Sequence, residues 1–159
     1  MPSKVDVQDI LPLIREKLEQ GGEVSLTVTG DSMYPFLRDG RDRVTIAPLM
    51  RPLRVNDVPL YLRAGGGLVL HRVMRVERDG RFACCGDHQW WLERSIRPEQ
   101  VLGIAVAFRR KGRSIRAGDL GYRLTSGLWR WLRPLRRPLF ALAGRLHRLR
   151  QEKRSETGE

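Results

Sequence analysis

Residues 27–44 read TVTGDSMYPFLRDGRDRV, and this stretch places a serine between two residues that constrain the backbone. Gly30 can adopt backbone angles that other residues avoid, while Pro35 fixes its own φ and favours an extended Tyr34. Ser32 is therefore expected on a rigid turn that would hold a hydroxyl nucleophile in place. Glycine, aspartate, serine and proline together are also typical of an ordinary turn, so composition alone does not decide between these interpretations.

On both sides of this turn apolar residues alternate with polar ones, as in half-buried strands. The alternation covers residues 24–28, 44–46, 58–62 and 68–77, and a nearly continuous apolar run at 101–108 predicts a central strand. Asp79-Gly80 is typical of a hairpin turn. Short strands broken by proline and glycine predict a mainly β fold, a compact antiparallel β-barrel-like domain over residues 23–112.

The segments on either side of this domain have helical periodicity. Apolar residues recur at helical spacing over residues 6–19, which predicts an N-terminal amphipathic helix within residues 1–22. We favour a helix packed against the barrel over a membrane or partner helix. The first thirty residues contain no continuous apolar run of the kind found in signal peptides and transmembrane segments.

Residues 113–151 are predicted to form a basic amphipathic helical tail, followed by a disordered terminus at 152–159. Of the net charge of +12, residues 113–159 carry +8, from 12 Lys or Arg against 4 Asp or Glu. Basic helices with interfacial tryptophan are typical of anchors on anionic membrane surfaces. The residues expected at such a surface are Trp129, Arg130, Trp131, Arg133, Arg136 and Arg137. Packing of the tail back on the domain is an equal alternative, and a nucleic-acid partner is disfavoured.

Cys84 and Cys85 are adjacent, so their side chains would point to opposite faces of a strand and are not expected to form a disulfide. Reduced, partly buried thiols fit a cytoplasmic protein better than a secreted one. These two cysteines, with His71 and His88, lack the paired spacing of a zinc site, so we predict neither a metal nor another cofactor.

Three boxes of residues in a fixed order resemble one peptidase superfamily. Residues 30–40 match the G-x-S-M-x-P-x-L-x-x-G box of type I signal peptidases and of the related self-cleaving repressor proteases. Residues 70–73, LHRV, resemble the H-R-V box of the archaeal, endoplasmic-reticulum and sporulation-type signal peptidases, in which histidine is the general base. Residues 85–88, CGDH, resemble the Gly-Asp box that follows. The resemblance covers about residues 24–110.

This resemblance implies a serine peptidase in which Ser32 is the nucleophile and His71 the general base. Asp87, in the Gly-Asp box, and Glu93, where the family carries a further aspartate, are alternative partners that would orient the histidine. Gly30, Met33 and Pro35 would shape the turn and the oxyanion site. Tyr34, Trp90 and Trp91 are weaker candidates for a substrate groove.

The implied function is cleavage of a leader or signal-like peptide, with a peptide or protein as the substrate. The family's membrane anchor before the serine box is missing, which favours a cytoplasmic protein or one peripheral to the inner face of the membrane. Gly30 also stands where signal peptidases often carry a hydroxyl residue that donates to the oxyanion. The alternative is a catalytically silent regulatory module on the same fold that binds a membrane surface or nucleic acid. The oligomeric state is not predicted.

Overall fold

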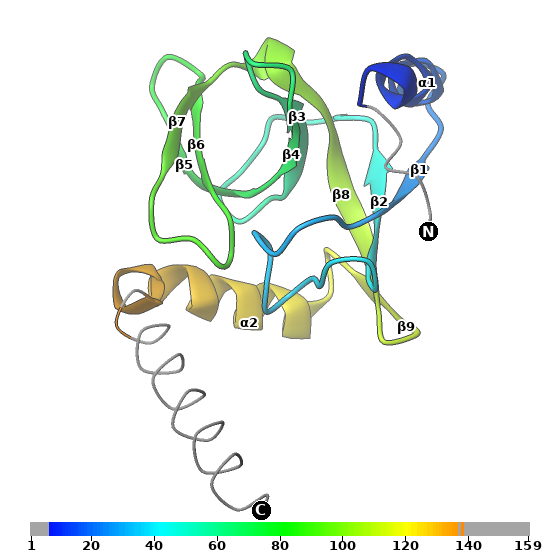
Figure 1. Ribbon diagram of the computed structural model, residues 1–159. Helices are drawn as coiled ribbons and strands as arrows, with labels where there is room; N and C mark the ends of the chain where they lie inside the picture. Colours follow the sequence, from blue (N-terminus) through cyan, green and yellow to red (C-terminus); the bar gives the residue numbers. More distant parts are fainter. Residues whose placement is uncertain (1–6, 137, 139–159) are drawn as a thin grey trace, which may run out of the picture.

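Two antiparallel sheets, with a helix before and after them in sequence, form the fold (Figure 1). The computed structural model describes residues 7–136 and 138. Its elements, in order, are α1 (Val7–Glu19), β1 (Val24–Thr27), β2 (Arg43–Ala47), β3 (Pro59–Leu62), β4 (Leu68–Leu70), β5 (Arg72–Val76), β6 (Phe82–Cys85), β7 (Glu93–Ile96), a 3-10 turn (Pro98–Gln100), β8 (Val101–Arg110), β9 (Arg113–Arg116) and α2 (Leu120–Trp131). The predicted mainly β, antiparallel fold with its N-terminal helix is confirmed.

The apolar run predicted as a central strand is β8, which organises the larger sheet. The strand order is β1-β2-β8-β3-β4, and β9 also pairs with β8. The pairing of β8 with β2 and with β3 shifts register in each case, at Thr45/Ile46 and at Leu60/Tyr61. Such irregularities increase the local twist of a sheet. The sheet therefore curls into a half-barrel that faces the three-stranded sheet β5-β6-β7 (Figure 1).

Two hydrophobic clusters fill the interior. The first lies between α1, the larger sheet and the serine turn, and Ile14 and Leu18 of α1 are buried in it. Met33 and Leu37, on either side of Tyr34 in the serine turn, belong to the same cluster. The second cluster lies between the two sheets and includes Tyr61. The serine turn is thus anchored by its own apolar side chains in the core that α1 covers.

The structure differs from the predicted strands at two places. Residues 68–77 were predicted as one strand, but they form β4 and β5, which belong to different sheets and meet at His71. The alternation at this point is lost because His71, Arg72 and Val73 are all buried where the chain passes between the sheets. The sheet also continues beyond residue 112, because Gly112 turns β8 back into β9 with a φ of 79°.

The described residues do not cover the whole predicted tail. Arg137, the predicted helical segment after residue 138 and the terminus at 152–159 lie outside them. Within residues 7–136 and 138, neither helix has the length and apolar character needed to cross a bilayer.

Candidate active site

The serine turn is closed by backbone hydrogen bonds at its base and by side chains at its tip. Val28 N donates to Asp42 O at 2.9 Å, and Gly40 N donates to Val28 O at 2.9 Å. Gly30 has the positive φ expected of it, 77°, and its amide donates to Asp39 Oδ1 at 2.8 Å. Ser32, partly exposed, follows directly. Ser32 therefore lies on a turn that hydrogen bonds close at both its base and Gly30.

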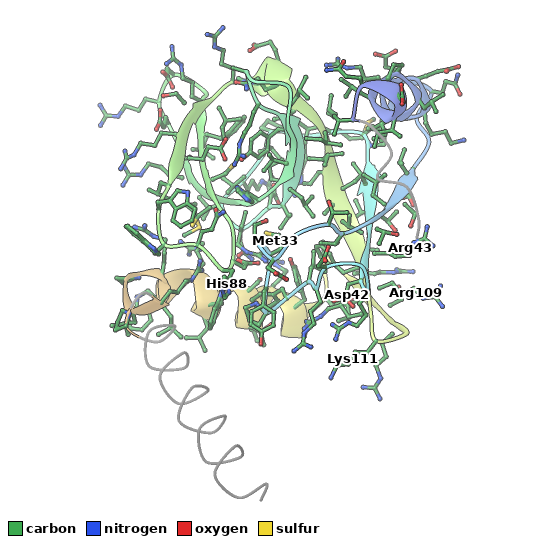
Figure 2. All side chains as sticks on the ribbon, in the orientation of Figure 1. Met33, Asp42, Arg43, His88, Arg109 and Lys111 are labelled. Carbon is green, nitrogen blue, oxygen red and sulfur yellow. The ribbon has the colours of Figure 1, made fainter. Side chains whose placement is uncertain are left out.

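Ser32 contacts the turn that follows β6. The backbone amide of His88 donates to Ser32 O at 2.8 Å. A Cβ atom on Gly86 would lie 2.5 Å from the same carbonyl oxygen, so a residue with a side chain cannot stand there without moving the serine turn. The Tyr34 and His88 rings lie edge to face, and their centroids are 5.4 Å apart. In Figure 2, Met33 and His88 lie together between the sheets and α2. The serine turn and the 86–88 turn thus form one unit.

His71 directly precedes β5, and Gly86 directly follows β6. The last residue pair of this ladder joins Arg72 to Cys85, the neighbours of His71 and Gly86. Ser32 therefore contacts the turn after β6 and His71 leads into the strand paired with β6, although 39 positions separate the two residues in sequence. No hydrogen bond joins Ser32 to His71 within the described part of the chain; catalytic hydrogen bonds often tighten only when substrate is bound.

His71 is buried against Tyr61 and Glu93. Its Nδ1 lies 3.3 Å from Tyr61 Oη and 3.4 Å from Glu93 Oε2. The Tyr61 hydroxyl itself donates to Glu93 Oε2 at 2.7 Å. Because only 2% of His71 is exposed, burial lowers the pKa of its imidazole to about 4. The imidazole is thus neutral at neutral pH, the state in which it can accept a proton.

Glu93 remains ionised next to this histidine. Arg63 holds it in a two-pronged contact, Nε to Oε1 at 2.6 Å and Nη2 to Oε2 at 2.7 Å. Burial by itself raises the pKa of Glu93, but the hydrogen bonds from Arg63 and Tyr61 outweigh it, and the pKa is lowered overall. Of the two acids predicted as partners of His71, Glu93 is the one that approaches its Nδ1.

Asp87, the other predicted acid, is paired with Arg72. Both side chains are completely buried, and Arg72 Nε and Nη2 donate to the two carboxylate oxygens at 2.9 and 2.7 Å. The remaining Arg72 nitrogen donates to Tyr122 Oη at 3.1 Å and to Asn56 O at 3.2 Å. The Arg72 guanidinium also lies over the rings of Phe36 and Tyr122, with its Cζ 5.3 and 5.6 Å from the ring centroids. This pair ties the serine turn, β5 and α2 together.

The other predicted residues are spread around this centre. Trp90 and Trp91 are about half exposed and meet edge-to-face at 5.7 Å. Pro35 O accepts a hydrogen bond from Arg110 Nη2 at 3.1 Å. A pocket of about 880 Å³ is lined by Glu93 together with Arg15, Arg63, Arg94 and Arg97, but neither Ser32 nor His71 lines it. The pocket therefore adjoins the site through Glu93 and its partner Arg63.

The predicted membrane-surface residues divide into two groups. Trp131 is exposed, whereas Arg136 is buried and donates to Gly86 O at 3.2 Å and to Gln89 O at 3.1 Å. Trp129 Nε1 donates to Asp87 O at 2.9 Å. Arg133 donates to Trp90 O at 2.8 Å, and Arg130 is partly buried. Trp129 and Arg136 thus hold α2 and its extension to the 86–89 turn, as expected for packing on the domain.

Comparison of the chain with protein-family models, with curated proteins and with solved structures finds no match. The case for a function therefore rests on the residues and their geometry. Within the described residues, no group of three or more His, Cys, Asp or Glu is placed to hold a metal ion. Cys84 and Cys85 are free and buried, and burial raises the pKa of Cys84 to about 12, so this thiol is not a nucleophile.

Two residues of the site were not predicted, Tyr61 and Arg63. Tyr61 lies in β3 and Arg63 directly follows it, two positions further along the chain. This two-residue spacing, which places them on the same side of an extended chain, is their local signal in the sequence. Their role depends on contacts with Glu93, the first residue of β7. Glu93 is 30 or more positions away from them in the sequence. A short strand at 93–96 has no apolar alternation strong enough to predict that contact.

The lowered pKa of His71 leads to an expected pH dependence of stability. Its pKa falls from the ordinary value of 6.5 to about 4 in the folded protein, so between these values the unfolded state binds the extra proton. Folding stability is therefore lost as the pH falls through this window. When the pH is lowered from 7 to 5, we expect the free energy of unfolding to fall by about 2 kcal/mol because of His71.

Urea unfolding of the wild type and of a His71→Gln variant at both pH values measures this contribution. The variant lacks the titrating group and retains Glu93, so the difference between the two proteins isolates His71. Equal losses of stability in the two proteins would contradict the prediction.

Proposed function

We propose that this protein is a serine endopeptidase of signal-peptidase type that cleaves a leader or signal-like peptide. Ser32 is the nucleophile, His71 the general base and Glu93 the acid that orients His71. The observation that supports the proposal is that Ser32 O contacts the turn after β6, at Gly86 and His88. His71 precedes Arg72, the β5 residue that pairs with the last residue of β6. The order of the three sequence boxes supports the same assignment.

The open edges of the larger sheet supply a place for the peptide. β1, β4 and β9 are edge strands of this sheet, and the first two adjoin the candidate residues in sequence. The chain after β1 runs into the serine turn, and β4 ends immediately before His71. An extended peptide can add to an exposed sheet edge through main-chain hydrogen bonds. A peptide bound along either edge would have its scissile bond directed to the reacting side chains.

Proton transfer follows from the contacts of His71. With Nδ1–H directed at Glu93 Oε2, the lone pair of the neutral imidazole is on Nε2. Nε2 takes the proton of Ser32 Oγ as this oxygen attacks the peptide carbonyl, and returns it to the amine that leaves. Water then hydrolyses the acyl-enzyme with the same base. Glu93 stabilises the imidazolium that forms in each step.

The oxyanion site has one clear donor. The backbone amide of Ser32 has no acceptor among the described residues and is free to donate to the developing oxyanion. The amide of Gly30 is already engaged by Asp39. Loss of one oxyanion donor costs about 2.7–4 kcal/mol of transition-state stabilisation, so we expect a slow enzyme unless the substrate brings a further donor into place.

The proposal is tested by labelling the purified protein with a serine-reactive fluorophosphonate and measuring its intact mass. We expect one adduct in the wild type and none in Ser32→Ala. Ser25→Ala, which changes an exposed serine on β1, is the matched control and should label like the wild type. An adduct that persists in Ser32→Ala, or a folded wild type that takes none, would favour the catalytically silent module instead.

A further inference from the structure

The apolar pattern of α2 predicts that its leucines are buried against the domain. The helix instead packs on the domain with its other face. Tyr122 and Ser126 are its buried residues. Large apolar side chains instead face outward and are 50–75% exposed. They form one stripe at helical spacing along α2 and the turn that follows it, here named the outer stripe: Leu120, Leu124, Leu128, Trp131 and Leu135. Contiguous exposed apolar surface of this kind marks an interaction site.

Polar contacts on the inner face keep the outer stripe exposed. Asn56 Nδ2 donates to Ser126 Oγ at 2.9 Å, and Arg72 donates to Tyr122 Oη at 3.1 Å. Trp129 Nε1 donates to Asp87 O at 2.9 Å. Rotating the helix to bury the leucines would break all three hydrogen bonds. The buried Nη1 of Arg72 would lose Tyr122 Oη as an acceptor and keep only its contact with Asn56. Among the described residues, nothing covers the outer stripe.

The charges around the stripe indicate the chemistry of that partner. Of the arginines in residues 120–136, Arg123 is exposed, Arg130 and Arg133 are partly buried and Arg136 is buried, and this segment contains no acidic residue. At the tip of the β8–β9 hairpin, Lys111 points away from the sheets at the end of the molecule where α2 lies (Figure 2). Nucleic acid would match the charge but offers no apolar phase for the leucines. A bilayer of anionic lipids offers both, and exposed tryptophan suits its interface.

We propose that α2 docks this protein on an anionic bilayer surface, with the outer stripe inserted among the lipid headgroups and acyl chains. The helix lies in the plane of the interface, and Arg123 and Lys111 contact the phosphates. Trp90 and Trp91 lie near the C-terminal end of α2, because Arg133, just after this helix, donates to Trp90 O. The inner-face contacts at residues 86–89 then hold the serine turn close to the membrane. This docking does not depend on Ser32 being a nucleophile.

Sedimentation of the full-length protein with vesicles tests the proposal. We expect binding to vesicles of phosphatidylglycerol and phosphatidylcholine, and much weaker binding to phosphatidylcholine alone. The Leu124→Gln/Leu128→Gln variant should bind anionic vesicles at least about tenfold more weakly, because it removes two inserted side chains. Leu13→Gln is the matched control, since Leu13 is an equally exposed leucine on α1, and it should bind like the wild type.

Three results would overturn the proposal. Unchanged binding by Leu124→Gln/Leu128→Gln would assign the membrane contact to another part of the chain. Loss of binding in Arg43→Gln/Arg109→Gln, a pair of facing arginines on β2 and β8, would assign it to the sheet (Figure 2). A wild type that forms dimers without lipid, while the stripe variant is monomeric by light scattering, would make the stripe an interface between copies. The measurement needs no substrate, so it stands apart from the test of Ser32.

Discussion

His71→Ala is expected to slow the fluorophosphonate labelling of Ser32 by about 10²–10⁴-fold, the range that a positioned general base contributes. The reason is geometric. His71 is neutral because it is buried, and its Nδ1 lies 3.4 Å from Glu93 Oε2. It precedes the β5 residue that pairs with the end of β6, next to the turn that contacts Ser32. The measurement is the second-order rate of adduct formation by intact mass, with folding checked by circular dichroism.

His88→Ala is the control for this experiment. His88 is exposed and adjacent to the serine turn, with its ring against Tyr34, so it would be the alternative histidine base. We expect this variant to label within a few-fold of the wild type. If His88→Ala lost labelling and His71→Ala kept it, the assignment of the base would be wrong. If neither changed the rate, Ser32 would be acylated without a histidine base.

Asp87→Asn is expected to lower the free energy of unfolding by about 3–5 kcal/mol, the usual cost of leaving one partner of a buried ion pair without its counter-charge. Arg72 and Asp87 are both 0% exposed, so no water can replace the lost carboxylate. The contacts of Arg72 with Tyr122 and Asn56 are neutral and cannot balance its charge. Urea unfolding followed by tryptophan fluorescence gives the value.

Two further variants make this result interpretable. Asp79→Asn changes an exposed acid that is paired with Arg81, and should cost less than about 1 kcal/mol. Arg72→Met/Asp87→Leu removes both buried charges and should recover most of the stability that Asp87→Asn loses. A loss below about 1 kcal/mol in Asp87→Asn would contradict the role of Asp87 as the structural partner of Arg72. Asp87 would then return as a candidate to orient His71.

The local features of the serine turn were predictable because they depend on neighbouring residues. The positive φ of Gly30 and the buried Met33 and Leu37 follow from a turn flanked by alternating strands. Helix α1 was predictable for the same reason, since its apolar residues recur every three or four positions and Ile14 and Leu18 are buried. In these segments, short-range geometry and hydrophobic burial favour the same structure.

The partners of the site residues were not predictable from the sequence, because they depend on register between distant segments. On the sequence, Asp87 was the stronger candidate for His71 and Glu93 the weaker one, but in the structure Asp87 pairs with Arg72 and Glu93 approaches His71. The contact of Glu93 with Tyr61 likewise requires β3 and β7 to meet.

By itself, the sequence determined the mainly β character of the fold, the two helices and the serine turn, which short-range spacing and apolar burial dictate. It did not determine the break between β4 and β5, nor strands β7 and β9. Only the tertiary structure decided which acid meets His71 and which face of α2 is covered. Apolar spacing alone favours burying the leucines of α2. In the structure, however, the inner face of α2 supplies Tyr122 to the buried Arg72 and Ser126 to Asn56, and the leucines face outward. Leaving buried polar groups unpaired costs more than exposing part of an apolar stripe, and that balance exists only once the chain is folded.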